Sequence, residues 1–274
     1  MPRLRLATSA WLVVGSASAA RCPAESRALL GPEDLLRFSH ALRRDRFSEA
    51  VACYERLASD FPQFAEGWFE LGQALTESGR TSEAVAAMQK GFQLAPSAPS
   101  GRVLDYGRAL QQLSRLDEAS AAYKAVVAQS PDDADALFHL GSVEDARGDK
   151  AAALASYKAA LEYDPPDEAR VHNNIGAVYT SMGELEPALA ALQEAVDVDP
   201  GLVDGWFNIG NAMLGLRRYA EADAHLEHAL RLSPEHAKVS LKLEQVRAAA
   251  VRDQEPWDRE RAEHQVEGAA SMLV

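Results

Sequence analysis

The chain has 274 residues and a formal charge of −13 at pH 7, from 28 Lys and Arg against 41 Asp and Glu. This excess of acidic residues argues against binding to nucleic acid or to an anionic membrane, since both require clustered cations. Its 51 alanines and 7% aromatic residues favour closely packed helices, and two cysteines are too few for a disulfide-dense scaffold or a four-cysteine zinc site.

The first twenty residues have the layout of a secretory signal peptide. Arg3 and Arg5 precede an apolar run over 6–14, and small residues follow with an A-x-A cleavage pattern at 17–19. The run is shorter than the ~20 apolar residues that a membrane span needs. We therefore expect cleavage, a secretory or extracytoplasmic location, and no stable membrane insertion afterwards. The alternatives are an uncleaved signal anchor and a cytoplasmic chain with an N-terminal tail.

Residues 21–31 are expected to link this segment to the fold. They include Cys22, and the chain's other cysteine is Cys53. Oxidising conditions along the secretory route would allow these two residues to form a disulfide, which the sequence alone does not decide.

A period of 34 or 35 residues runs through 32–236. Each of six repeats contains a proline, an alanine twelve residues before it and, in five repeats, a glycine twelve residues before that alanine. A Tyr, Met or Leu follows each alanine by four positions. The repeats are 32–64, 65–98, 100–133, 134–167, 169–202 and 203–236, and their prolines are Pro62, Pro96, Pro131, Pro165, Pro200 and Pro234.

This spacing predicts two antiparallel helices in each repeat. A small residue on the first helix allows the alanine of the second helix to approach, and Ser39 takes the place of the glycine in the first repeat. Gly79, Gly148 and Gly183 are predicted to end first helices with a left-handed backbone. Because each helix pair leaves an apolar face uncovered, neighbouring pairs must stack to complete a core.

Two segments follow the last repeat. Residues 237–251 interleave charged and apolar side chains, a pattern that predicts a solubilising capping helix with one apolar face. Residues 252–274 have mixed charge, and we expect a frayed or weakly helical tail.

The repeat resembles that of the tetratricopeptide repeat (TPR) family, whose pattern combines W-x-x-L-G-x-x-Y, A-x-x-x-F and P. The sixth repeat matches it best, with Trp206, Ile209, Gly210, Ala222 and Pro234. The resemblance implies an all-α, right-handed superhelical solenoid of about six helix-turn-helix repeats. It also implies that the first helices line a concave groove for a protein or peptide segment, as in a scaffold or adaptor.

Carried over residue by residue, the resemblance places nine candidate side chains in this groove. Asparagine donates and accepts hydrogen bonds at once, so a ladder of asparagines could hold the backbone of an extended peptide whatever its sequence. Phenylalanines between them would be apolar anchors. Alternatively, these are simply common residues of the repeat. The nine residues are Asn173, Asn174, Asn208, Asn211, Phe69, Phe138, Phe207, Arg108 and Gln73.

The asparagines of the last two repeats look like the groove of O-linked N-acetylglucosamine transferase. A TPR region or targeting subunit related to that enzyme, without its catalytic domain, is therefore the alternative function. Chaperone-binding TPR proteins hold a terminal carboxylate with Lys and Arg. In this sequence the positions that would need Lys and Arg, near Asn174 and Asn208, hold other residues: Phe138, Ser142, Ala177 and Asp204. We therefore expect no binding to Hsp70 or Hsp90.

The sequence lacks the common catalytic and cofactor-binding motifs. It contains no phosphate loop and no dinucleotide-binding, zinc-protease or serine-hydrolase motif. His225 and His228 share a helix face, as metal ligands do, but solvated surface histidines are more common. Asp197, Asp199 and Gly201 resemble the start of a calcium loop that lacks its other ligands. We therefore predict no metal, no cofactor and no enzymatic activity.

Overall fold

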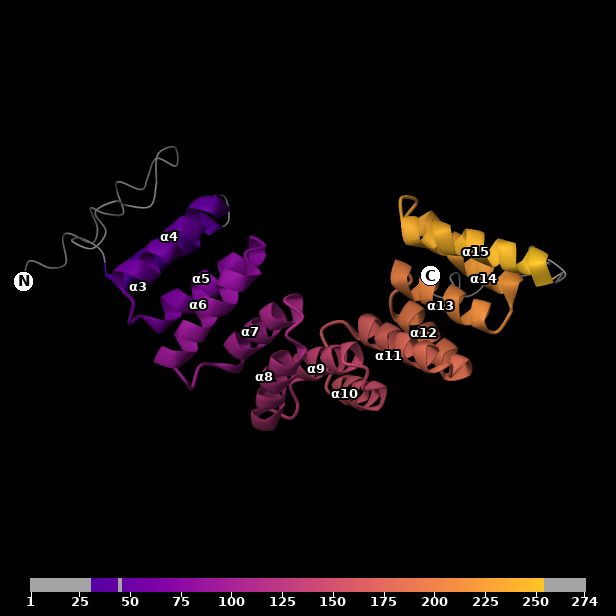
Figure 1. Cartoon of the computed structure of the whole chain (residues 1–274), viewed down its shortest axis with the longest axis horizontal. Helices are drawn as coiled ribbons and strands as arrows, with labels where there is room; N and C mark the ends of the chain where they lie inside the picture. The colour runs from indigo at the N-terminus through magenta and orange to yellow at the C-terminus, as the bar shows by residue number, and fades with distance from the viewer. Residues whose placement is uncertain (1–30, 44–45, 254–274) are drawn as a thin grey trace, which may run out of the picture. The chain divides into compact units, whose positions relative to one another are not determined.

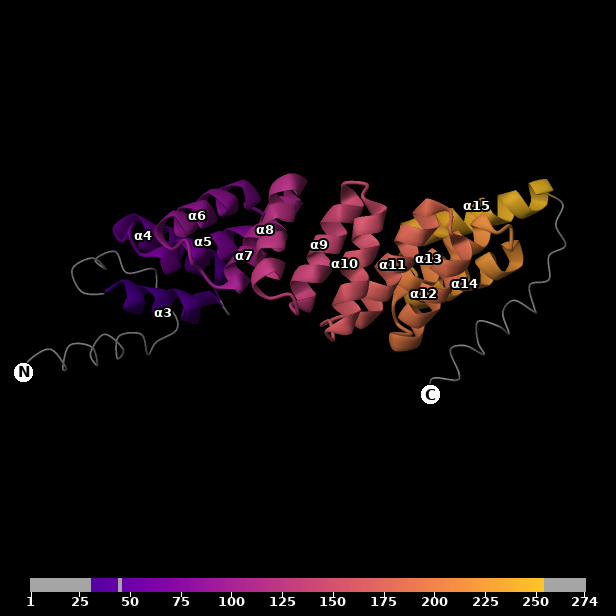
Figure 2. The same ribbon diagram turned by 90° about the horizontal axis from the view of Figure 1, so that it is seen from below.

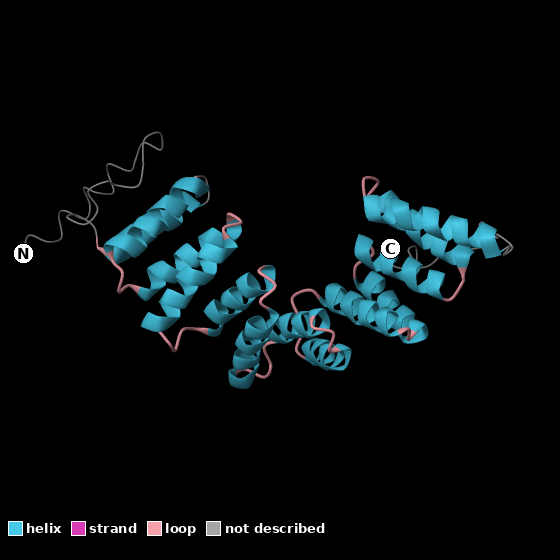
Figure 3. Ribbon diagram, in the orientation of Figure 1, coloured by secondary structure: helices cyan, strands magenta, loops and turns pink. Residues whose placement is uncertain are grey.

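The computed structural model describes residues 31–43 and 46–253. These residues form thirteen α-helices and no strand, as the sequence predicts (Figure 3). The predicted signal peptide, nearly all of the predicted linker and the tail from residue 254 lie outside the described residues. The chain divides into two compact units, unit 1 (Met1–Arg115) and unit 2 (Leu116–Val274), which are described separately below.

The described part of unit 1 contains two antiparallel helix pairs and a further helix (Figures 1 and 2). Each helix packs against the next one along the chain, so a first helix always lies beside a second helix. The helices are α3 (Pro32–Arg43), α4 (Phe47–Asp60), α5 (Ala65–Glu77), α6 (Thr81–Leu94) and α7 (Ser100–Gln112).

Unit 2 continues the pattern with eight helices in its described part. Its last helix packs on α14 and ends two residues beyond the predicted capping segment. The helices are α8 (Leu116–Gln129), α9 (Ala134–Ala146), α10 (Lys150–Glu162), α11 (Glu168–Met182), α12 (Leu185–Val198), α13 (Val203–Gly215), α14 (Tyr219–Leu232) and α15 (Ala237–Asp253).

The turns between paired helices use a left-handed residue. Gly79, Gly148 and Gly183 have φ of 78°, 85° and 79°, which confirms the prediction for these three positions. Ser114 and Arg217 occupy the same turn with φ of 58° and 59°. The turn geometry is therefore kept at two positions where the sequence has no glycine.

Three helices of unit 2 begin with an aspartate cap. The side chains of Asp133, Asp149 and Asp167 each accept a hydrogen bond from the backbone N–H three residues later, at 2.9 to 3.1 Å. Such a cap satisfies a backbone donor that has no partner within the helix. These residues therefore define where α9, α10 and α11 start.

The small residue of the first helix does face the second helix, although its main contact differs from the expected one. A Cβ added to Gly210 would lie 2.6 Å from Cγ of Leu226, and one added to Gly141 would lie 2.8 Å from the ring of Tyr157. Both neighbours follow the predicted alanine by four residues. The glycine therefore makes room for this large buried side chain rather than for the alanine methyl group.

Substituting Gly210 with Ala is expected to lower the free energy of unfolding by about 1–3 kcal/mol, because the added Cβ would lie 2.6 Å from Cγ of the fully buried Leu226, which would have to shift. Urea unfolding followed by circular dichroism would measure the change. Gly101→Ala on α7 is the matched control: an added Cβ meets nothing within 4 Å there, so helix propensity predicts a small gain. Equal effects at the two positions would contradict the packing argument.

The last helix completes the core of unit 2. Val239, Leu243 and Val246 of α15 are at most 7% exposed and belong to the cluster that contains Trp206. Arg247 of α15 also donates to the fully buried carboxylate of Asp223, at 2.6 Å. This helix therefore closes the apolar face of α13 and α14, which agrees with a capping role.

Cys53 on α4 is fully buried and disulfide-bonded. The chain's one other cysteine, Cys22, lies outside the described residues. Its pairing with Cys53 stays a prediction.

Candidate functional site

The predicted asparagines of unit 2 lie on neighbouring first helices, since α11 packs against α13. Nδ2 of Asn208 donates to Oδ1 of Asn173 over 2.9 Å, which joins the two helices. Asn173 is 7% exposed, so its amide is not accessible to a ligand and instead holds the side chain of Asn208 in place. Oδ1 of Asn208 makes no hydrogen bond within the described residues and is available to a ligand.

Two further asparagines extend this row of amides. Nδ2 of Asn174 donates to the hydroxyl of Tyr157 at 3.3 Å. Burial raises the pKa of Tyr157 to about 12, so the hydroxyl remains protonated at neutral pH. Asn211 follows Asn208 on α13, is partly exposed and forms no hydrogen bond with any residue that the structure describes. The amides of Asn174, Asn208 and Asn211 thus offer both donors and acceptors on α11 and α13.

Partly buried phenylalanine rings accompany the asparagines. The ring centroid of Phe138 lies 5.9 Å from that of Tyr157, the tyrosine that Asn174 contacts. The ring of Phe207 lies 6.4 Å from that of His236, and Phe207 packs against the core of this part of unit 2. Both rings are fixed by packing on one side and retain exposed surface on the other. They are suited to an apolar contact beside a hydrogen-bonded backbone.

Phe69, the third predicted anchor, does not lie on an open surface. It is 3% exposed, and its ring packs edge-on against Phe92 with centroids 4.9 Å apart. The reason is Gly91: a Cβ there would lie 2.8 Å from the Phe69 ring, whereas the sixth repeat has Ala229 at the same position. The missing side chain lets the Phe69 ring enter the core of unit 1, so we correct its assignment from groove anchor to core residue.

The other two predicted residues of unit 1 are engaged by neighbouring side chains. Oε1 of Gln73 accepts a hydrogen bond from Arg43 at 3.4 Å. Arg108 forms an ion pair with Asp105 at 3.3 Å, and 41% of its side chain is exposed. Both residues belong to unit 1, whereas the four asparagines belong to unit 2. Five of the nine predicted residues are partly exposed on the first helices of unit 2: Asn174, Asn208, Asn211, Phe138 and Phe207. Asn173 lies on the same helices but is buried and holds Asn208. Gln73 and Arg108 contact other side chains of unit 1, and Phe69 is a core residue.

A charged cluster on the first helices of unit 1 was not predicted. Its centre is Glu70 of α5, whose side chain is 8% exposed. The carboxylate is 2.9 Å from Nε2 of His40, and it accepts hydrogen bonds from Arg43 at 3.3 Å and from Arg102 at 2.6 Å. Arg43 also pairs with Glu77, and Arg102 with Glu66. We call these six residues the Glu70 cluster; it links α3, α5 and α7.

The charges of the cluster keep Glu70 ionised. Burial by itself would raise the pKa of Glu70, but the hydrogen bonds and charges of Arg102 and His40 outweigh burial and lower the pKa below its usual value. Glu70 has the same repeat position as Asn174 and Asn208. That acidic residue in an asparagine position is the signal by which the cluster could have been found.

The histidines considered as metal ligands have another role in the structure. His225 and His228 of α14 both pack on Trp206, with ring centroids 5.7 and 4.4 Å from it. Asp199 accepts a hydrogen bond from the backbone N–H of Gly201 at 2.9 Å, as in a turn. Residues 31–43 and 46–253 contain no group of three metal-ligating side chains, and none of their helices has both the length and the apolar character to cross a bilayer.

Sequence models of the tetratricopeptide repeat match residues 35–99 and 104–168, 169–202 and 203–236. A curated relative, the Protein O-mannosyl-transferase TMTC1 of Mus musculus, is 28% identical over 120 residues, which are 43% of this chain and 13% of the relative. The chain thus spans a small part of that relative's length.

Solved structures show the same fold. The APC/C hetero-tetramer Cut9–Hcn1 aligns with a TM-score of 0.65 and 19% identity, over 89% of this chain and 46% of the other. YrrB, described as a TPR protein with an unusual peptide-binding site, aligns with a TM-score of 0.54 and 19% identity, over 70% of this chain and 97% of the other. At these identities the likeness is one of fold.

Proposed function

The chain belongs to the tetratricopeptide repeat family, and on that premise we propose that it is a non-catalytic adaptor that binds an extended segment of a partner protein on the first helices of unit 2. The observation that carries the proposal is the hydrogen bond from Asn208 to Asn173, because it fixes the orientation of one amide and leaves its Oδ1 to a ligand. The residues that we assign to binding are Asn174, Asn208, Asn211, Phe138 and Phe207.

An extended peptide is the ligand that these side chains fit best. Its backbone presents donors and acceptors in alternation, and each asparagine amide supplies both. An amide already held by the fold loses less freedom on binding than a mobile one. The rings of Phe138 and Phe207 would take apolar side chains of the same segment. We expect micromolar affinity, about 8 kcal/mol, since the segment must be ordered on binding.

The combined variant Asn174→Ala and Asn208→Ala tests this assignment. A partner would be captured from the native host with the wild-type chain, and its binding segment mapped with overlapping synthetic peptides. We expect the variant to bind the mapped peptide about 30-fold more weakly, since two hydrogen bonds contribute about 1 kcal/mol each. Isothermal titration calorimetry would measure both affinities.

Gln245→Ala on α15, an exposed amide outside the site, is the matched control and should bind as the wild type does. Circular dichroism would establish that both variants are folded. A folded double variant with unchanged affinity for the mapped peptide would show that the asparagines are not the binding residues.

A second candidate is supported by the mouse relative, whose name describes an O-mannosyl-transferase. In this version the chain presents proteins to a glycosyltransferase carried by another chain. Co-purification of a glycosyltransferase with the wild-type chain, lost in the double asparagine variant, would favour it over a general adaptor.

We propose a secretory or extracytoplasmic location on the pattern of residues 1–20, with a cytoplasmic location as the alternative. Mass spectrometry of the chain from its own host would find a mature N-terminus near Ala20, whereas an intact Met1 would exclude cleavage.

The charge of −13 supports a protein partner over nucleic acid, and the missing Lys and Arg near Asn174 and Asn208 argue against Hsp70 or Hsp90.

A further inference from the structure

Two tryptophans occupy the same position in different repeats. Trp68 lies on α5 of unit 1 and Trp206 on α13 of unit 2, four residues before the glycine of each repeat. Nε1–H of Trp68 donates to the carbonyl oxygen of Pro62 at 3.0 Å, and that of Trp206 donates to Pro200 at 2.9 Å. Both indoles are therefore held in the same way by their own repeats.

The two indoles differ in what covers them. Trp206 is 1% exposed, because the rings of His225 and His228 pack on it with centroids 5.7 and 4.4 Å away. These histidines follow the tryptophan by nineteen and twenty-two residues. The same offsets from Trp68 lead to Ala87 and Lys90, and Trp68 is partly exposed. The first tryptophan has no aromatic cover where the second has two rings.

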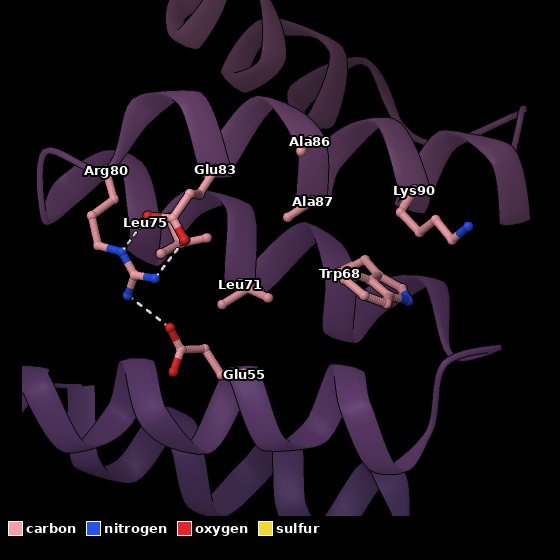
Figure 4. A pocket seen from close by; sticks show the side chains of 9 residues that line it. All are labelled: Glu55, Trp68, Leu71, Leu75, Arg80, Glu83, Ala86, Ala87 and Lys90. Carbon is pink, nitrogen blue, oxygen red and sulfur yellow. Dashed lines mark hydrogen bonds and ion pairs between the residues drawn. The ribbon is translucent and has the colours of Figure 1, made fainter.

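A pocket of about 330 Å³ opens beside Trp68 (Figure 4). Its apolar part is formed by Trp68, Leu71 and Leu75 of α5 and by Ala86 and Ala87 of α6. This volume is at the small end for ligand sites, which run from about 300 to 1,000 Å³, and it suits one ring with its neighbouring groups. The missing histidine rings thus leave a space that another ring can fill.

Charges distinguish the two ends of the pocket. At one end, Arg80 pairs with Glu55 at 2.7 Å and with Glu83 at 2.6 Å, so both carboxylates there are bound. At the other end Lys90 lies near Trp68, and its ammonium group forms no ion pair with any described residue (Figure 4). The charge available to a ligand is therefore a cation close to the indole.

We propose that this pocket binds an aromatic side chain of a partner protein, stacked on Trp68, with a carboxylate next to that side chain bound by Lys90. We expect the partner's aromatic ring to pack on Trp68 as His225 and His228 pack on Trp206, since aromatic pairs prefer such contacts. The positive charge of Lys90 is complementary to the carboxylate of the partner, and this is why we include a carboxylate in the ligand. The site is formed by α4, α5 and α6 and is independent of the asparagine site in unit 2.

Three dipeptides test the ring and the charge separately: acetyl-Phe-Asp-amide, acetyl-Phe-Lys-amide and acetyl-Leu-Asp-amide. The readout is the indole N–H resonance of Trp68 in ¹H–¹⁵N spectra of the whole chain, assigned with Trp68→Phe. We expect acetyl-Phe-Asp-amide to shift this resonance with a Kd of about 1–5 mM, and the other two to bind at least about 5-fold more weakly. The indole resonance of Trp206 should not move, because its ring is already covered.

Variants then test the two residues that leave the pocket open. Lys90→Ala should make the Asp and Lys dipeptides bind equally. Ala87→His combined with Lys90→His supplies the rings found over Trp206 and should weaken acetyl-Phe-Asp-amide at least about 10-fold, whereas Gln89→His, outside the pocket on α6, should leave it unchanged.

The proposal is overturned if no dipeptide shifts the Trp68 resonance up to about 20 mM, or if the leucine dipeptide binds as well as the phenylalanine one. Unchanged binding by Lys90→Ala or by the folded double histidine variant would overturn it as well. Lys90→Ala changes only an exposed side chain, so the charge test does not depend on the folding of the double variant.

Discussion

Acidification from pH 7.5 to pH 5 is expected to lower the free energy of unfolding of unit 2 by about 2 kcal/mol through His225. This residue is 8% exposed, and its Nδ1 is buried without a hydrogen-bond partner. Burial lowers the pKa of His225 to about 4. The charge of Glu221 opposes this shift, and those of His228 and Arg218 add to it. The folded chain therefore holds His225 in its neutral form.

The loss of stability at low pH follows from the different pKa of His225 in the folded and the unfolded chain. In the unfolded chain a histidine has a pKa of about 6.5, so between pH 6.5 and pH 4 the unfolded chain takes up a proton that the folded chain does not. Stability is complete above about pH 6.5, falls as the pH drops, and levels off below about pH 4 after a total loss of about 3 kcal/mol.

Urea unfolding at pH 7.5, 6 and 5 would measure the loss, with His225→Phe as the comparison. Phenylalanine keeps a ring on Trp206 and does not titrate, so most of the loss should disappear. Glu70 and Asp253 do not contribute to the loss between pH 7.5 and pH 5, because their lowered pKa values keep both carboxylates ionised in the folded chain at pH 5. An equal loss in the wild type and the variant would show that another group causes it.

The helix pairs could be predicted from the sequence because a repeat encodes the same local contacts six times. Gly79, Gly148 and Gly183 mark the turns, because glycine adopts the left-handed conformation that these turns need without a steric penalty. Ser114 and Arg217 show the limit of such signals: they adopt the same left-handed conformation although neither is a glycine.

The candidate site was less predictable, because side chains at one repeat position meet different neighbours. Phe69 and Phe207 share a position, yet Gly91 admits the first ring into the core while Ala229 does not leave such a space for the second. Likewise Glu70 stands where Asn174 stands in a later repeat. A repeat pattern predicts the face on which a residue lies, whereas its partners depend on residues elsewhere in the chain.

The Glu70→Ala substitution is expected to lower the free energy of unfolding of unit 1 by about 2–3 kcal/mol. Removing one member of a buried ion pair is costly because the remaining charge loses its partner. Here the ion pairs left to Arg43 and Arg102 would be those with Glu77 and Glu66, both 44% exposed, and exposed pairs contribute at most about 1 kcal/mol. The loss is therefore smaller than for a single isolated buried pair.

Thermal and urea unfolding of Glu70→Ala, Glu70→Gln and Glu83→Ala would separate charge from packing. Glu70→Gln keeps the volume and an acceptor but not the charge, so its loss should be about half that of Glu70→Ala. Glu83 pairs with Arg80 on an exposed surface, and its removal should change stability little. If Glu70→Ala were as mild as Glu83→Ala, the apolar core alone would hold α3, α5 and α7 together. The arginines of the Glu70 cluster would then be free to exchange Glu70 for a carboxylate of a partner at little cost in stability.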